Sequence, residues 1–255
     1  MRNSTLRRVL LLSGLAMVGF QACRKDDAAM MAMPEVPDQS FVEEFDTTAS
    51  AYSRGWVPIN TSLPKGRSVW VQGLFNDPAV TGLPYPIPFG PFSSKGSFPG
   101  FIGADYLSTS AAAGIISNWL VSPVVTMRNG DKIIFYTRTA VYNLGGGDST
   151  DFANRLQVRM SPENESLNVG NGDATGDFKF TLLDINPTYL EAHTSPALYD
   201  PNAYPIRWTR FEAQVGGLNG PTKGRFAFRY YTEEAGSNGR GSAVAVDSVA
   251  YVGKR

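Results

Sequence analysis

The residues that could carry out catalysis are few and scattered in this sequence of 255 residues. His193 is the single histidine, in a proline-flanked stretch, and a surface or structural role is expected for it. No Gly-x-Ser-x-Gly or His-Glu-x-x-His motif occurs. Glu43 and Glu44 are neighbours on an expected strand and point to opposite faces, which is wrong for shared work on one bond. A non-enzymatic protein is predicted, with a glycosidase as the alternative because its two carboxylates can be far apart in sequence.

Charge and glycine patterns give no support for nucleic-acid or phosphate binding. The 23 basic residues balance the 23 acidic ones, and no polybasic run occurs. The glycines at 145–147 lack the Gly-Lys-Ser/Thr ending of a phosphate loop, and no helical pattern follows them. Asn171-Gly172-Asp173 with Asp177 is an acidic cluster without EF-hand spacing, so a solvated turn is expected.

Residues 1–22 have the pattern of a secretory signal. Three arginines come before an apolar run at 9–20, which is too short to span a bilayer as a helix. The run ends in Ala22-Cys23, which resembles a bacterial lipobox and implies a lipid on Cys23. The alternative is an ordinary cleaved signal with an incidental cysteine. Cys23 is the single cysteine, so an intrachain disulfide is excluded.

Residues 23–39 are predicted to be a flexible tether. Arg24-Lys25-Asp26-Asp27 resembles the surface-export signal of Bacteroidetes lipoproteins, with a solvated linker as the alternative. Residues 28–39 are rich in alanine, methionine and proline and show no clear period. The expected location is therefore the outer membrane, with the protein held by its lipid anchor alone and exposed at the cell surface.

From residue 40 onward the sequence predicts many short strands separated by turns. Residues 154–161 alternate apolar and polar side chains, which is typical of a half-buried strand. Outside the signal, no helix of useful length shows a 3.6-residue period. The pattern predicts an all-β domain over 40–255, a jelly-roll β-sandwich of two antiparallel sheets. The other expected strands are 40–45, 55–60, 68–75, 178–185, 207–215, 224–231 and 242–252.

Residues 115–138 are predicted to form a hairpin around which the other strands pack. Two β-rich runs are joined by Arg128-Asn129-Gly130-Asp131, and Asn-Gly between apolar runs is the strongest short hairpin signal. Ser122-Pro123 interrupts the first run, which predicts an edge strand or a bulge there.

Residues 82–103 contain many prolines and five aromatic residues, four of which come before residue 100 and have no obvious place in a strand. Proline removes backbone donors, so this stretch is not a central strand, and long loops are often functional. One expectation is a lid folded over a sheet; another is a ligand platform whose aromatic faces stack on a sugar ring; the third is simple disorder. The candidate ligand-binding residues are Tyr85, Phe89, Phe92 and Phe98.

The order of motifs along the chain resembles the choice-of-anchor J domain family. The most specific part is Trp119-Leu120-Val121-Ser122-Pro123. The resemblance implies a jelly roll, similar to MAM and cleaved-adhesin domains, that adheres to glycans or proteins without catalysis. The accompanying motifs are Glu44-Phe45-Asp46, Gly55-Trp56, Trp70, Leu156-Gln157-Val158-Arg159-Met160-Ser161, Trp208-Thr209-Arg210-Phe211, Arg225-Phe226-Ala227-Phe228-Arg229-Tyr230 and Val246-Asp247-Ser248-Val249.

The resemblance also implies a structural calcium ion between the first and last strands. Calcium takes several hard oxygen ligands, and Glu44, Asp46 and Asp247 stand at the corresponding positions; exposed strand-end carboxylates are the alternative. The predicted function is a cell-surface lipoprotein that binds an extracellular glycan or protein. A glycan-acting hydrolase and a purely structural envelope component are the alternatives.

Overall fold

The computed structural model describes residues 37–74, 92 and 100–254. The chain divides into the units Met1–Pro37 and Asp38–Arg255, and the second carries the fold. In the part of the chain that the structure describes, no helix is long and apolar enough to cross a membrane. The elements are β1 (Phe41–Glu43), α1 (Thr48–Ser53), β2 (Val57–Asn60), β3 (Val71–Leu74), β4 (Gly100–Asp105), the 3-10 helix η1 (Tyr106–Ser108), β5 (Gly114–Val121), β6 (Val125–Met127), β7 (Lys132–Thr139), β8 (Tyr142–Gly145), β9 (Asp148–Thr150), β10 (Leu156–Ser161), β11 (Phe180–Ile185), β12 (Thr209–Gln214), β13 (Thr222–Ala235) and β14 (Ala243–Val252).

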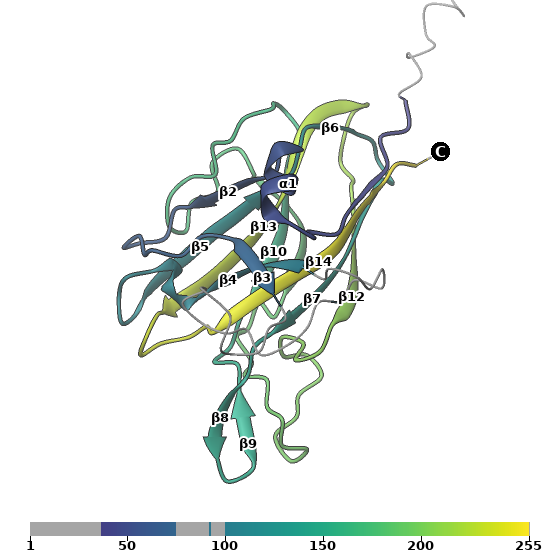
Figure 1. Ribbon diagram of the computed structural model, residues 1–255. Helices are drawn as coiled ribbons and strands as arrows, with labels where there is room; N and C mark the ends of the chain where they lie inside the picture. Colours follow the sequence, from purple (N-terminus) through teal and green to yellow (C-terminus); the bar gives the residue numbers. More distant parts are fainter. Residues whose placement is uncertain (1–36, 75–91, 93–99, 255) are drawn as a thin grey trace, which may run out of the picture. The chain divides into compact units, whose positions relative to one another are not determined.

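Two six-stranded antiparallel sheets form the domain, which confirms the predicted all-β sandwich (Figure 1). The β14 sheet has the order β12-β7-β14-β4-β3, with β1 paired to the far half of β14. The β13 sheet has the order β11-β10-β13-β5-β2, with β6 paired to the start of β13. The short hairpin β8–β9 extends away from both sheets (Figure 1).

Aromatic side chains fill the space between the sheets. Phe135 of β7 meets Phe228 of β13 with ring centroids 4.8 Å apart, so the contact joins one sheet to the other. Trp56, just before β2, packs edge-on against Phe226 at 5.7 Å and against Phe45 at 5.2 Å. Alternate positions of β13 point into this core because side chains on a strand alternate between faces.

The predicted hairpin at 115–138 is wrong, although its turn is present. Strands β5 and β6 pair with β13, whereas β7 pairs with β14 and β12, so the Asn129-Gly130 turn carries the chain from one sheet to the other. Buried Asp131 secures this turn by accepting hydrogen bonds from the amides of Arg128 and Lys254, both at 2.7 Å. The run is interrupted at Ser122-Pro123, since β5 ends at Val121 and β6 begins at Val125. The expected edge strand is wrong, because β5 lies between β13 and β2.

Strand β10 is fully buried rather than half-buried. All six of its residues are buried, because residues 162–179 cover the outer side of the β13 sheet. The Nε of Arg159 donates to the carbonyl of Phe178 at 2.8 Å. Buried Arg229 donates through Nη2 to the carbonyl of Gly172 at 2.6 Å, and its guanidinium lies over the ring of Tyr231 at 4.0 Å. The 162–179 loop is therefore a third layer, held down by two arginines.

Candidate functional site

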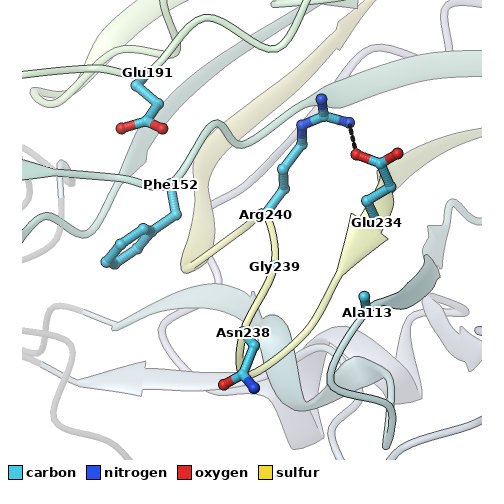
Figure 2. A pocket seen from close by; sticks show the side chains of 7 residues that line it. All are labelled: Ala113, Phe152, Glu191, Glu234, Asn238, Gly239 and Arg240. Carbon is cyan, nitrogen blue, oxygen red and sulfur yellow. Dashed lines mark ion pairs between the residues drawn. The ribbon is translucent and has the colours of Figure 1, made fainter.

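An open groove of about 470 Å³ lies at one end of the sandwich, between loops that are distant in sequence (Figure 2). In this view Phe152 and Glu191 lie on one side, Glu234 and Ala113 lie on the other, and the segment from Asn238 to Arg240 runs between them. The lining residues are Ala113, Phe152, Glu191, Glu234, Asn238, Gly239 and Arg240.

Buried Asp151 positions one side of the groove. Its Oδ1 accepts hydrogen bonds from the amides of Ala153 at 3.0 Å and Ala192 at 2.8 Å, and its Oδ2 accepts from the amide of Asn154 at 3.1 Å. Burial raises the pKa of the Asp151 carboxyl, and these amide hydrogen bonds act in the opposite direction. Asp151 thus ties the turn that carries Phe152 to the segment that carries Glu191.

Buried Asn154 connects the third loop to the same assembly. Its Nδ2 donates to the hydroxyls of Thr139 at 2.7 Å and Ser242 at 2.8 Å. Its Oδ1 accepts from the hydroxyl of Tyr230 at 2.7 Å and from the amide of Ser242 at 3.0 Å. Ser242 follows the segment that carries Arg240, so a satisfied polar network lies behind the groove. Such networks specify one arrangement when every member is paired.

Left-handed backbone conformations concentrate around the groove, in its loops and at the end of β13. Phe152 has φ 56°, Ala153 62°, Tyr189 57° and Glu234 52°. The left-handed region costs a non-glycine residue about 1–2 kcal/mol, and such strain gathers at functional sites. Because Phe152 and Glu234 both line the groove, the strain falls on the residues that a ligand would meet.

The groove contains more acidic than basic side chains. Nη1 of Arg240 lies 3.1 Å from Oε2 of Glu234, and its guanidinium lies 4.8 Å from the centre of the Tyr189 ring. Oε2 of Glu191 accepts a hydrogen bond from the hydroxyl of Thr150 at 2.8 Å and lies 3.7 Å from Nε2 of His193. Among the residues that the structure describes, Oε1 of Glu191 makes no hydrogen bond, so one oxygen is held in place and the other is available to a ligand.

The single histidine, His193, lies between Asp148 and the groove residue Glu191. Its Nδ1 lies 2.8 Å from Oδ2 of Asp148 in β9. The amide of Ser195 donates to the other oxygen of Asp148 at 3.0 Å, and this hydrogen bond lowers the pKa of the Asp148 carboxyl, with His193 adding to the effect. Both nitrogens of His193 thus face carboxylates rather than a hydroxyl nucleophile, which fits the expected structural role.

The two carboxylates in the groove lack the burial that is typical of a hydrolase pair. Glu191 is 50 % exposed and Glu234 is 74 % exposed. The general acid of a glycosidase needs a raised pKa, which burial in an apolar pocket usually supplies. In Figure 2 the side chain of Arg240 also lies between them. The arrangement therefore suits hydrogen bonding to a ligand better than cleavage of one.

Of the four aromatic residues predicted to bind a ligand, Phe92 falls within the described part of the chain. Its ring stacks on Tyr136 of β7 with centroids 3.5 Å apart and planes 14° apart, and its amide donates to Oδ2 of Asp247 at 2.8 Å. At this position the lid interpretation fits, because one face of the ring is already covered. Three of the predicted residues lie outside the described residues, namely Tyr85, Phe89 and Phe98.

Two of the three predicted calcium ligands meet around Ser248. Buried Asp247 accepts a hydrogen bond from the Ser248 amide at 2.7 Å, and the hydroxyl of Ser248 donates to the carboxylate of Glu44. Asp46 is exposed. Over residues 37–74, 92 and 100–254, no three His, Cys, Asp or Glu side chains group closely enough to hold a metal ion. The three carboxylates alone are therefore not a donor set, and calcium binding stays a prediction.

The groove residues were not predicted from the sequence. Asp151-x-x-Asn154 and Asn238-Gly239-Arg240 both read as ordinary turns. Each turn has local polar signals, but no sequence pattern says that they meet. Their meeting depends on β10, β13 and β14 lying in register in two sheets.

Comparison with known proteins finds fold-level likeness only. No family model matches the chain, and no curated protein matches it. The K1 cleaved adhesin domain of Lys-gingipain from Porphyromonas gingivalis is 16 % identical, with a TM-score of 0.49 over 85 % of this chain and 99 % of that one. The K3 domain of the same protein is 15 % identical, with a TM-score of 0.48 over 86 % and 100 %.

A carbohydrate-binding module is also similar in arrangement. The family 11 module from Clostridium thermocellum, in complex with a mixed-linked tetrasaccharide, is 10 % identical, with a TM-score of 0.37 over 86 % of this chain and 98 % of that one. At these identities and TM-scores the likenesses carry no argument about function. The neighbours include adhesin domains and carbohydrate-binding modules, and also an α-L-arabinofuranosidase and an enzymatically active phage tailspike domain, so what this chain binds must be argued from its own groove.

Proposed function

We propose that this protein is a non-enzymatic cell-surface lipoprotein whose β-sandwich binds an extracellular glycan in the groove. The observation that carries the proposal is Phe152, a large apolar side chain held at φ 56° in the lining of an open polar groove. Binding sites for small ligands combine aromatic or apolar surface with a few fixed polar groups. The ring of Phe152 would meet the apolar face of a sugar.

The polar groups around Phe152 match the hydroxyls of a sugar. Glu191 is fixed at Oε2 by Thr150, so its Oε1 can accept from a hydroxyl group. The amide of Asn238 can both donate and accept. Asp151 and Asn154 hold these loops before any ligand arrives, and such preorganisation lowers the entropic cost of binding.

The proposed location rests on the first 39 residues. The signal pattern, the lipobox-like Ala22-Cys23 and the tether support an outer-membrane protein with a lipid on Cys23. The motif resemblance to choice-of-anchor J domains supports an adhesion-type role. Incorporation of labelled palmitate into the protein, and its loss in Cys23→Ser, tests the anchor separately from ligand binding.

A glycan array with the purified full-length protein tests the proposed binding. The protein is expected to bind at least one glycan class, and Phe152→Ala is expected to lose that binding. Tyr199→Ala, at a 62 % exposed tyrosine outside the groove, is the matched control and should bind as the wild type does. Absence of binding to every glycan, or equal loss in both variants, contradicts the proposal.

Protein adhesion is a second candidate, favoured by exposed apolar side chains on and near the β8–β9 hairpin. Tyr142 and Leu144 on β8 are 37 % and 55 % exposed, and Leu198 is 55 % exposed. The residues after His193 run beside β9, since the amide of Thr194 donates to the carbonyl of Ser149. Exposed apolar groups that gather together mark protein contact sites. Leu144→Asp should then reduce attachment to a protein-coated surface while glycan binding is unchanged.

A further inference from the structure

We infer that the groove selects uncharged glycans and rejects acidic ones, through the carboxylate of Glu191. This inference rests on the proposed glycan binding and adds the chemical class of the ligand. It follows from how the charges of the lining residues are paired, not from the shape of the groove.

The single basic side chain in the lining is already neutralised. The lining contains one arginine and two glutamates. Arg240 pairs with Glu234 at 3.1 Å, so the charge of its guanidinium is already balanced and a ligand carboxylate would compete with Glu234 for it. Its other neighbour is the ring of Tyr189, which holds the guanidinium in place from one side.

Glu191 leaves one negative charge in excess. Within the described part of the chain it has no lysine or arginine partner, and its contacts are the hydroxyl of Thr150 and Nε2 of His193 at 3.7 Å. His193 does not offset that charge, because its Nδ1 faces a second carboxylate, Asp148, at 2.8 Å. The region around Glu191 is therefore acidic at neutral pH.

An excess carboxylate treats neutral and acidic sugars oppositely. A sugar hydroxyl can donate to Glu191, and a hydrogen bond to a charged acceptor is among the stronger ones. A uronate or sulfate about 5 Å away would instead be repelled. In a partly hydrated groove that repulsion corresponds to a difference of about tenfold in affinity.

The test compares oligosaccharides that match in linkage and differ in charge. Purified full-length protein is titrated with β-1,4-linked gluco-oligosaccharides and with the corresponding glucurono-oligosaccharides. A second pair, α-1,4-linked galacto-oligosaccharides and galacturono-oligosaccharides, is titrated in the same way. Both pairs are measured by calorimetry at fixed ionic strength. In whichever pair binds, the neutral oligosaccharide is expected to bind about tenfold more tightly than the acidic one.

Glu191→Gln keeps the shape of the side chain and removes its charge. This variant is expected to bind the acidic member about tenfold more tightly than the wild type does, and to bind the neutral member less tightly, because the sugar hydroxyl loses a charged acceptor. Glu165→Gln makes the same chemical change outside the groove, at a 55 % exposed side chain, and should change neither.

The outcomes separate this inference from the proposed function. Equal or tighter binding of the acidic member to the wild type overturns the charge selection while glycan binding stands. If Glu191→Gln binds the acidic oligosaccharide no more tightly than the wild type does, the role of Glu191 is likewise overturned. If the wild type binds no member of either pair and no glycan on the array, the proposed function and this inference fail together.

Discussion

Replacing Phe152 with glycine is expected to give a more stable protein than replacing it with alanine. Both changes remove the ring and its contact with Tyr142, whose centroid is 6.0 Å away. They differ in the backbone: alanine keeps the strain at φ 56°, whereas glycine adopts that angle freely. The comparison therefore isolates the strain from the loss of the side chain.

The expected magnitude follows from two opposing costs. The left-handed region costs alanine about 1–2 kcal/mol. Glycine loses more backbone entropy on folding, which costs about 0.5–1 kcal/mol. The net advantage of Phe152→Gly over Phe152→Ala is then about 0.5–1 kcal/mol. For a domain of this size it corresponds to about 1–4 °C in Tm.

Denaturant unfolding and calorimetry of both variants measure this difference, and glycan titration accompanies them. A matched pair at Phe211, in β12 and without a positive φ, should show the opposite sign, because glycine weakens a strand relative to alanine. Phe152→Gly less stable than Phe152→Ala would refute the strain argument. Glycan binding retained in either Phe152 variant would refute the role of the ring.

Three further predictions concern the support of the groove, alkaline stability and calcium. Asp151→Ala is expected to destabilise the protein by about 3 kcal/mol and to abolish glycan binding, because several buried amides lose their acceptor; denaturant unfolding measures this, and a loss below about 1 kcal/mol contradicts it. Burial raises the pKa of Tyr204 and Tyr251, so their contribution to stability is complete below about pH 10 and is lost as pH rises further, when the unfolded state gives up protons that the folded state keeps. Unfolding free energies at pH 8, 10 and 11 should fall in that order, and a flat profile contradicts the argument. If calcium binds at Glu44 and Asp247, a calcium concentration about 100-fold above Kd should raise the unfolding free energy of the wild type by about 2–3 kcal/mol. The unfolding free energy of Asp247→Asn should not change. Thermal unfolding with and without chelator measures both.

Most strands could be predicted from the sequence, but their partners could not. The patterns at 224–231 and 242–252 correctly indicated β13 and β14, although most residues of both strands are buried rather than every second one. Asn129-Gly130 correctly indicated a turn, yet turn chemistry does not say whether the next strand stays in the same sheet. Helix α1 was not predicted, because six residues are too few to show a helical period.

The groove could not be predicted because its parts are far apart in the chain. Phe152 and Glu191 come from two different connections and Glu234 from the end of β13, and each stretch reads as an ordinary polar loop in the sequence. Asp151 and Asn154 join those connections through buried hydrogen bonds, and such bonds leave no periodic signal in the sequence. The predicted ligand-binding residues lie in 82–103 instead, because the composition of that stretch is unusual over many consecutive residues.

The loop layer that Arg159 and Arg229 hold over the β13 sheet limits where this protein could evolve new binding specificities. Residues 162–179 cover the outer face of the β13 sheet, so a long polymer cannot bind along these strands. Substitutions that opened this face would first have to disrupt a packed layer. The loop tips at the groove carry no such burden. Exchanging a handful of their side chains could retarget the molecule while leaving its interior as it is.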